Sequence, residues 1–302
     1  MLRCCAFALL LGLLLLNVAC HSSSSPKTYC FISHTYQWGA KDNNEVDHRL
    51  RAMDFEAFDQ IWLGGDLCAR SSERSSTLHY LDSIFFISQP STHWSLGNHD
   101  LTRGSLSDIK SITQRPSFYT RSFDGLCLLV LNTNFNHPQL TAPDECAQQN
   151  QQFALLKSIT DTISKASHLI ILHHHCLLTN TLTNNQLDMD TIFHYYRPQL
   201  AFSCQPPGSF EQLVYPLLRQ VQKRGVQVLL IAGDLGQRQK TFEFRTAEGI
   251  YFLGTGINNS LDPAFAPDYV TNFDPDRVLL FEHFPEERRL EWEFVLLEKL
   301  RD

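Results

Sequence analysis

Short apolar runs alternate with longer mixed segments along most of the chain. The runs that predict strands are residues 29–33, 60–63, 92–96, 127–132, 168–172, 226–232, 241–245, 250–254, 277–283 and 290–297. Mixed segments at 44–58, 75–88 and 150–166 separate the early runs, and the last has the period of an amphipathic helix, with apolar Phe153, Leu155, Leu156, Ile159 and Ile163. Strands alternating with helices predict a layered α/β fold, and the closing run of strands predicts a second sheet facing the first.

The organisation of the chain predicts one domain. Hydrophobic residues make up 43% of the 302 residues and charged residues 19%, which is ordinary for a protein with a sizeable core. No repeat or linker divides residues 29–302, so we interpret them as a single domain. Residues 179–216 are polar, aromatic and proline-bearing. They are either an insertion over the functional face or an ordinary loop and helix remote from it.

The N-terminus has the pattern of an exported protein. Arg3 precedes an apolar run at residues 6–16 that is too short to span a bilayer, so residues 1–19 are predicted to be a signal peptide. Ala19-Cys20 and the Ser-rich tether at 20–28 resemble a bacterial lipobox, although Asn17 replaces the usual Leu. We expect a lipid on Cys20 and a place on the bacterial cell envelope, periplasmic or surface-facing. A cleaved signal without lipid and an uncleaved anchor are the alternatives.

The cysteines and the net charge indicate which disulfides and which kinds of ligand to expect. In an oxidising compartment disulfides form. Cys146 and Cys204, which lie in polar loops with prolines nearby, are the predicted pair, whereas Cys30, Cys127 and Cys176 adjoin apolar runs and are predicted to be buried thiols. The formal net charge of −7 argues against non-specific nucleic-acid binding. A phosphorylated small molecule is still allowed, because a bound metal supplies local positive charge.

Five of the apolar runs lead directly into polar groups that can bind a metal. These groups are His34, Asp66, Asn98, the cluster His173-His174-His175, and Asp234. Because ligands of open α/β sheets bind beyond the carboxyl ends of the strands, we expect these side chains to converge on one place. The glycines before Asp66, Asn98 and Asp234 permit tight turns and close approach of the backbone there.

Gly65-Asp66, followed by Gly97-Asn98-His99-Asp100 and then the strand-end histidines, resembles the calcineurin-like metallophosphoesterase family. The resemblance covers nearly the whole mature chain in order and spacing. It implies a four-layer α/β/β/α sandwich of two mixed sheets flanked by helices. It also implies a centre with one or two divalent ions, chosen from Mn, Fe, Zn and Mg, in which one carboxylate, here Asp66, bridges two cations.

The resemblance assigns Asp66, Asn98, His174 and Asp234 to the family's second metal. The first metal site departs from the family pattern. The family's Asp-x-His motif corresponds to His34-Thr35-Tyr36 here, and its Gly-His-x-His motif to Gly233-Asp234-Leu235-Gly236. His34 and Asp66 remain as candidate ligands of the first metal, Tyr36 is open, and Gly236 has no side chain to offer. We therefore expect one metal to bind firmly and a second weakly.

The resemblance also implies catalytic roles. His99 would donate a proton to the leaving group, and Asp100 would hold the His99 ring in orientation. Arg103 and Arg238 are either phosphate contacts or solvated side chains.

The predicted function is hydrolysis of a phosphomonoester or phosphodiester outside the cytoplasm, on a small molecule or an envelope glycan or lipid. A catalytically degenerate binding or structural module of the envelope is the rival, which the loss at Gly236 favours. The intact Gly-Asn-His-Asp motif favours the enzyme. A third alternative is a one-metal reaction on surface carbohydrate or lipid.

Overall fold

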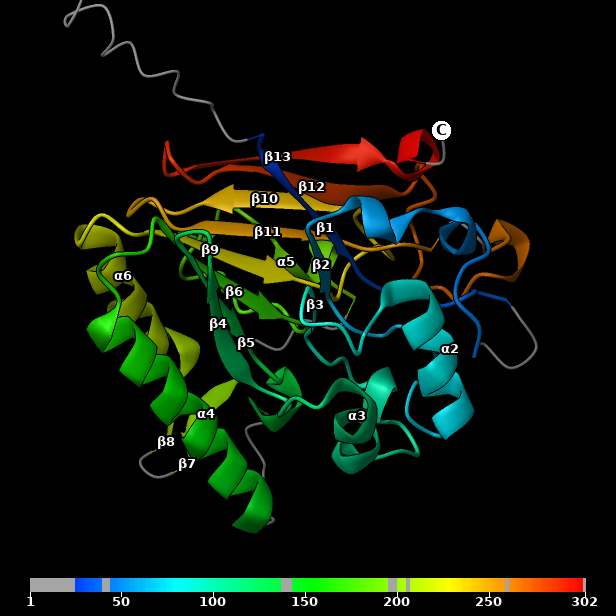
Figure 1. The fold of residues 1–302 in the computed structure, drawn as a ribbon, viewed down its shortest axis with the longest axis horizontal. Helices are drawn as coiled ribbons and strands as arrows, with labels where there is room; N and C mark the ends of the chain where they lie inside the picture. Colours follow the sequence, from blue (N-terminus) through cyan, green and yellow to red (C-terminus); the bar gives the residue numbers. More distant parts are fainter. Residues whose placement is uncertain are drawn as a thin grey trace, which may run out of the picture.

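The computed structural model describes residues 25–39, 44–136, 143–194, 200–204, 207–258 and 261–300 (Figure 1). The predicted signal peptide and Cys20 lie outside these residues, as does most of the tether. Within the described residues, no helix combines the length and the apolar character that crossing a membrane requires.

Two mixed sheets form the centre of the fold. The first has the order β13-β12-β1-β2-β3, with bounds Arg289–Leu296, Arg277–Phe284, Lys27–Ile32, Gln60–Leu63 and Thr92–Trp94. Strands β1, β2 and β3 run parallel to each other, and β12 and β13 continue the sheet in antiparallel fashion. The parallel strands therefore deliver their carboxyl ends to one edge of the sheet.

The second sheet has the order β10-β11-β9-β6-β5-β4. Its strands are Thr241–Arg245, Tyr251–Thr255, Gln227–Ala232, His168–His173, Leu126–Val130 and Tyr119–Phe123. Strands β5, β6, β9 and β11 are parallel, and the outer strands β4 and β10 are antiparallel to their neighbours. The central β6 and β9 are almost continuously apolar, as expected for parallel strands that are covered on both faces.

Helices cover the outer faces of both sheets. The α-helices are α2 (Ser75–Phe85), α3 (Leu106–Thr113), α4 (Pro143–Thr162), α5 (Met189–Ile192) and α6 (Tyr215–Lys223). Short 3-10 or π turns are Leu50–Ala52, Phe55–Ala57, His99–Leu101, Thr133–Asn136, Phe210–Val214, Pro263–Phe265 and Leu297–Leu300. Figure 1 shows α4 and α6 on one side of the strands and α2 and α3 on the other.

Three apolar cores separate the layers. Residues of α2 and α3 pack with the first sheet, residues of α4 and α6 pack with the second, and a third core lies between the two sheets. The third core is mostly aliphatic and contains an aromatic group in which Tyr29 and Phe281 both pack against the fully buried Trp62. The predicted four-layer sandwich of two mixed sheets flanked by helices is confirmed.

The closing strands do not form the second sheet. Strands β10 and β11 extend the second sheet, which already begins at β4, whereas β12 and β13 return to the first sheet beside β1. Both sheets thus combine strands from the two halves of the chain. A run of consecutive strands in the sequence does not indicate which strand joins which sheet.

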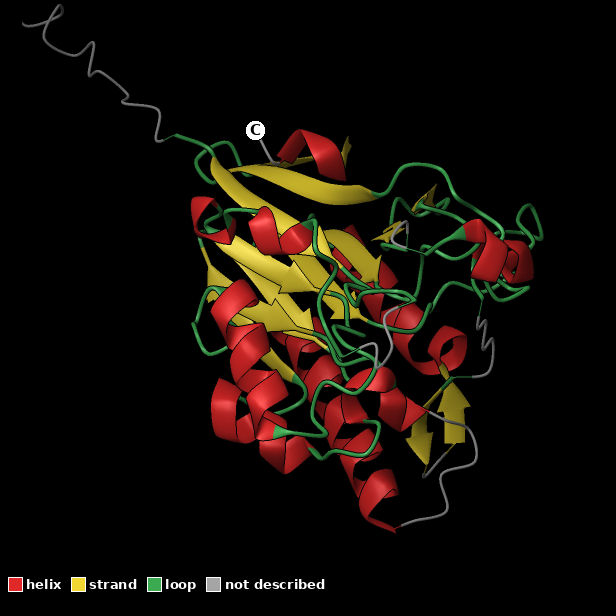
Figure 2. Cartoon of the chain, turned by 90° about the vertical axis from the view of Figure 1, so that its right-hand side faces the viewer, coloured by secondary structure: helices red, strands yellow, loops and turns green. Residues whose placement is uncertain are grey.

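Residues 179–216 contain α5 and a separate pair of strands, β7 (Ala201–Cys204) and β8 (Pro207–Ser209). Figure 2 shows a small strand pair apart from the main sheets. Cys204 is paired in a disulfide with Cys146 of α4, with Cα atoms 5.7 Å apart, as the sequence predicts. The predicted buried thiols Cys30, Cys127 and Cys176 are free and buried.

Candidate metal centre

The loops beyond the ends of the two sheets touch at two glycines. A Cβ atom on Gly233 would lie 1.8 Å from the carbonyl oxygen of Gly64, and a Cβ on Gly64 would lie 2.8 Å from the Gly233 Cα. Gly64 follows β2 and precedes Asp66, and Gly233 follows β9 and precedes Asp234. Because neither glycine has a side chain, the loops that carry the two aspartates can touch.

Four buried side chains converge at this contact. His34, His174 and Asp234 each offer a ligand atom within 4.8 Å of the other two. The Nε2 atom of His34 lies 3.2 Å from Oδ2 of Asp66 and 3.5 Å from Oδ1 of Asp234. The Nε2 atom of His174 lies 3.5 Å from the same Asp66 oxygen. Two imidazoles and two carboxylates therefore face a common point.

This donor set fits one divalent cation. Metal–ligand bonds of about 2.0–2.2 Å in a tetrahedral site place neighbouring ligand atoms about 3.4 Å apart. The three nitrogen–oxygen distances given above, 3.2–3.5 Å, match this spacing. The Nε2 atom of His174 is buried and has no hydrogen-bond partner, which is costly unless a cation or carboxylate satisfies it. The cluster can hold a metal ion, and mixed nitrogen and oxygen donors suit Zn or Mn.

Hydrogen bonds to the other ring nitrogens orient both histidines. Nδ1 of His174 lies 2.7 Å from the carbonyl oxygen of Gly64, so Nδ1–H donates and Nε2 is the ring nitrogen left for the cluster. Nδ1 of His34 lies 2.7 Å from the side-chain amide of the buried Gln237, whose other amide atom is unpaired. An amide oxygen turned toward Nδ1 would fix the same ligating tautomer in His34.

Within the cluster, the carboxylates and the imidazoles shift each other's pKa in opposite directions. Burial alone would raise the pKa of Asp66, but the neighbouring His174 and His34 hold it well below its usual range. Burial opposes protonation of His174, yet the carboxylate of Asp66, with Asp234 adding, raises the pKa of His174 to about 10. A bound cation would replace the proton that these groups share.

Asp66 directs a single oxygen toward the cluster. Its Oδ1 accepts the backbone N–H of His99 at 2.9 Å, which leaves Oδ2 facing the two histidines. A Cβ on Gly97 would lie 2.0 Å from this Oδ1, so the turn before Asn98 must be glycine for the carboxylate to fit. The predicted bridging of two cations by Asp66 would therefore use Oδ2.

Asp100 does not orient the His99 ring as predicted. Among the described residues, its carboxylate accepts the backbone N–H groups of Asp66, Leu67 and Gly97 at 2.8–2.9 Å, and the side chains of Trp94 and Ser71 also donate to it. The reason is geometric, because Asp100 is fully buried beneath the two loops. Asp100 instead clamps the Asp66 loop to the Asn98 loop, which positions both.

His99 and Asn98 lie at the rim of the cluster. Nδ1 of His99 lies 3.1 Å from the carbonyl oxygen of Ala69, and this contact, not Asp100, orients its ring. Asn98 is exposed, and both residues line a cavity beside the cluster. His99 therefore faces the space that a substrate would occupy, and Asn98 lies farther out than the four buried candidates.

Gly236 adopts a backbone conformation that excludes a ligand. Its φ is 116°, and a Cβ there would lie 2.8 Å from the carbonyl carbon of Gly256. Tyr36 is buried, and burial raises its pKa well above the usual range, with Asp66 adding to the effect. A neutral phenol is a poor metal ligand, so the structure adds no support for Tyr36 as a ligand.

The remaining candidates lie away from the cluster. His173 bonds to the carbonyl oxygen of His175, and His175 pairs with Thr133, so His174 is the member of the triplet that reaches Asp66. Arg103 is exposed and pairs with Glu73, and Arg238 donates to the carbonyl oxygen of Asp190. Neither arginine lines the cavity.

The cavity beside the cluster has a volume of about 320 Å³. Besides predicted residues, it is lined by Trp38, His194, Gln237 and Tyr269, which sequence reasoning missed. Trp38 lies two residues after Tyr36, and Gln237 lies three residues after Asp234. Their closeness in sequence to these candidates could have indicated that they lie near the site. His194 and Tyr269 come from loops without a motif.

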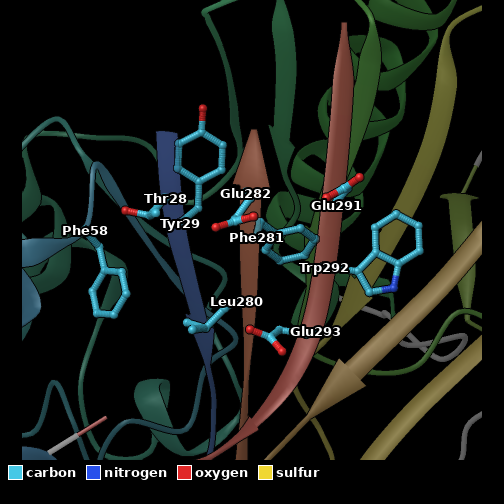
Figure 3. A pocket seen from close by; sticks show the side chains of 9 residues that line it. All are labelled: Thr28, Tyr29, Phe58, Leu280, Phe281, Glu282, Glu291, Trp292 and Glu293. Atoms are coloured by element: carbon cyan, nitrogen blue, oxygen red, sulfur yellow. The ribbon is translucent and has the colours of Figure 1, made fainter. Parts of the chain in front are cut away.

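A larger cavity of about 420 Å³ lies elsewhere, on the first sheet. Thr28 near the start of β1 lines it, together with Phe58, Leu280 and the glutamates of β12 and β13 (Figure 3). Glu282 and Glu291 are directly opposite each other on neighbouring strands. This cavity lacks the buried, convergent ligands of the strand-end cluster, so the cluster remains the candidate functional site.

Comparisons with known proteins support the fold. No family model matches the sequence, and no curated protein matches it. The chain is similar to GAP50, the anchor in the inner membrane complex of Plasmodium, with a TM-score of 0.50 and 11% identity over 91% of this chain and 86% of that one. Phosphopantetheinyl hydrolase (PptH) from Mycobacterium tuberculosis matches with a TM-score of 0.43 and 14% identity, over 80% of this chain and 99% of that one. The likeness to GAP50 concerns the fold alone, and neither likeness carries an activity to this chain.

Proposed function

We propose that the protein is a metal-dependent phosphoesterase with one firmly bound divalent cation. The observation that carries this proposal is the convergence of His34, Asp66, His174 and Asp234, all buried, beside an open cavity. Buried ionisable groups that face one point at the end of a cleft are typical of a functional site rather than a structural one.

The roles of the side chains follow from their positions. A cation held by the four ligands would make a water molecule more acidic and neutralise charge on a phosphoester. Gln237 holds the ring of His34, and the Gly64 carbonyl holds that of His174. His99, with Nδ1 held by the Ala69 carbonyl, lines the cavity, and its ring when protonated on both nitrogens can give a proton to the departing oxygen.

A non-catalytic envelope module is the second candidate. It is favoured by the conformation of Gly236, which removes one ligand of the family pattern. The similarity in fold to a protein described as an anchor is compatible with it but does not distinguish the two functions. The position of His99 at the cavity favours the enzyme, since a binding module has no need of a proton donor there.

Metal loading and hydrolysis separate the two functions. The purified protein would be stripped with a chelator, loaded with Zn²⁺, Mn²⁺ or Mg²⁺, and assayed on bis(4-nitrophenyl) phosphate and 4-nitrophenyl phosphate. We expect one equivalent of metal and hydrolysis that disappears with the chelator and returns with the cation. A protein that binds metal normally but hydrolyses neither ester with any cation would instead be the binding module.

Export and a lipid on Cys20 are part of the same proposal. The apolar run, the Ala19-Cys20 pair and the disulfide between Cys146 and Cys204 support it, because disulfides persist in oxidising compartments. Replacing Cys20 with Ser should move the protein from the membrane to the soluble fraction of bacterial cells. A Cys30→Ser variant is the control, because Cys30 lies within the fold and should leave the distribution unchanged.

A further inference from the structure

Two aromatic stacks form part of the wall of the cavity beside the metal cluster. The rings of Tyr36 and Trp38 stack with centroids 4.8 Å apart and planes 27° apart. The rings of His194 and Tyr269 stack with centroids 3.8 Å apart and planes 17° apart. All four residues line the same cavity as Asp66 and Asp234. The wall therefore joins aromatic surface to the metal-ligating groups within one small cavity.

Tyr36 connects the two ends of this cavity. Its ring centroid lies 6.2 Å from that of His34, a candidate ligand, and 5.8 Å from that of His99, the candidate proton donor. On its other side Tyr36 stacks on Trp38, which is only 6% exposed. A ligand with its charged group at the cluster would reach the aromatic wall within the length of one small molecule.

The chemistry of the wall favours a flat, uncharged ring. The acidic residues that line the cavity, Asp66 and Asp234, belong to the metal cluster. The aromatic end thus offers stacking surface without a carboxylate of its own for a quaternary ammonium group. A cavity of about 320 Å³ lies at the small end of the range of about 300–1,000 Å³ for ligand sites. It suits a compact ester rather than a polymer.

We propose that Trp38 and Tyr269 select phosphoesters whose organic group is a planar aromatic ring, such as an aryl or nucleobase-bearing group. The proposal rests on the proposed function, because the metal cluster is what holds the phosphoryl end. Stacking of a base on an aromatic side chain strengthens binding by about 5- to 150-fold, equivalent to about 1–3 kcal/mol. That gain is available to a planar ring and not to a puckered aliphatic one.

Phosphonates test the selection without hydrolysis, because their carbon–phosphorus bond is stable. The metal-loaded full chain would be titrated by calorimetry with phenylphosphonate, cyclohexylphosphonate and inorganic phosphate. We expect phenylphosphonate to bind about 5- to 150-fold more tightly than cyclohexylphosphonate. Trp38→Leu and the more exposed Tyr269→Leu should each bring this ratio toward one while the affinity for inorganic phosphate is unchanged. Trp292→Leu, on the far cavity of the first sheet, should keep the ratio.

The outcomes separate this inference from the proposed function. Equal binding of the two phosphonates, or a ratio that neither leucine variant changes, overturns the aromatic selection while leaving the phosphoesterase intact. A trimethylammonium-ethyl phosphonate that binds more tightly than phenylphosphonate overturns it in favour of a cation cage. A protein that binds neither metal nor inorganic phosphate overturns both. Because Tyr269 is only partly buried, Tyr269→Leu decides the matter even if Trp38→Leu fails to fold.

Discussion

The Nε2 atom of His34 lies 3.2 Å from Oδ2 of Asp66, and both residues have a left-handed backbone, with φ of 51° and 55°. Such a conformation costs about 1–3 kcal/mol in a residue other than glycine, so it persists only where the surrounding structure enforces it. Here the clamp of Asp100 on the Asp66 and Leu67 N–H groups and the bond from His34 N to the Gly65 carbonyl enforce it. This backbone conformation directs the two side chains toward the same point.

Asp66→Asn should abolish metal binding. The amide keeps the size of the side chain but removes the negative charge that faces both His34 and His174. We expect less than a tenth of an equivalent of bound metal after dialysis, measured by elemental analysis, and no hydrolysis. Asp54→Asn makes the same chemical change at an exposed carboxylate and should bind metal normally. Full metal content in Asp66→Asn would remove Asp66 from the ligand set.

His99→Gln should leave the metal in place and slow hydrolysis by about 10²- to 10⁴-fold, the range for a lost general acid. The reason is that the His99 side chain lines the cavity but is separate from the buried cluster. The loss should be larger for an alkyl ester than for a nitrophenyl ester, because a good leaving group needs no proton. A variant that loses metal and activity together would show that His99 acts as a ligand.

Much of the fold follows from the apolar runs, since strands in a buried parallel sheet are continuous and easily detected. Strands β2 and β10 have the predicted bounds. Strand β4 was missed because it is an edge strand of mixed polarity that pairs only with β5. Helix α4 begins earlier than its apolar period predicts. The reason is that the buried position just before the predicted segment is held by a polar residue, Gln149, whose side chain bonds to neighbouring backbone.

The candidate site, too, was predictable only in part. The strand ends predicted where His34, Asp66, His174 and Asp234 would meet, because parallel strands share an edge. The role of Asp100 was not predictable, since its partners are backbone N–H groups whose positions exist only in the folded loops. His194 and Tyr269 reach the cavity through tertiary packing, which no local spacing encodes.

Acid should destabilise the protein through buried histidines. Burial, with Arg115 and Arg121 adding, lowers the pKa of His93 to about 3. The folded state therefore keeps the ring neutral while the unfolded chain takes up a proton below pH of about 6.5. The contribution of His93 is fully present above that pH and is lost as the pH falls toward 3, at about 1.4 kcal/mol per pH unit.

Urea unfolding between pH 7 and pH 4 measures this slope. His93→Gln should flatten the pH dependence of the unfolding free energy by about the slope of one histidine. His79→Gln, which changes an exposed histidine, should leave the dependence unchanged. Burial also lowers the pKa of His168 to about 4, so part of the slope should survive in His93→Gln. An unaltered slope in His93→Gln would mean that His93 is protonated in the folded protein.

Exchanging the ligand types of His34 and Asp234 tests whether they share one cation. Their atoms Nε2 and Oδ1 lie 3.5 Å apart, which is close enough for one cation to contact both. His34→Asp adds a negative charge to the set and Asp234→His removes one, and each should weaken Zn²⁺ binding. The double variant restores the total charge, so its loss of affinity should be smaller than the sum of the two single losses by about 0.5–3 kcal/mol. Asp54→Asn combined with His34→Asp is the control and should be additive. Additive losses in the exchange itself would place His34 and Asp234 on different cations, which would restore the two-metal arrangement that the family resemblance implies.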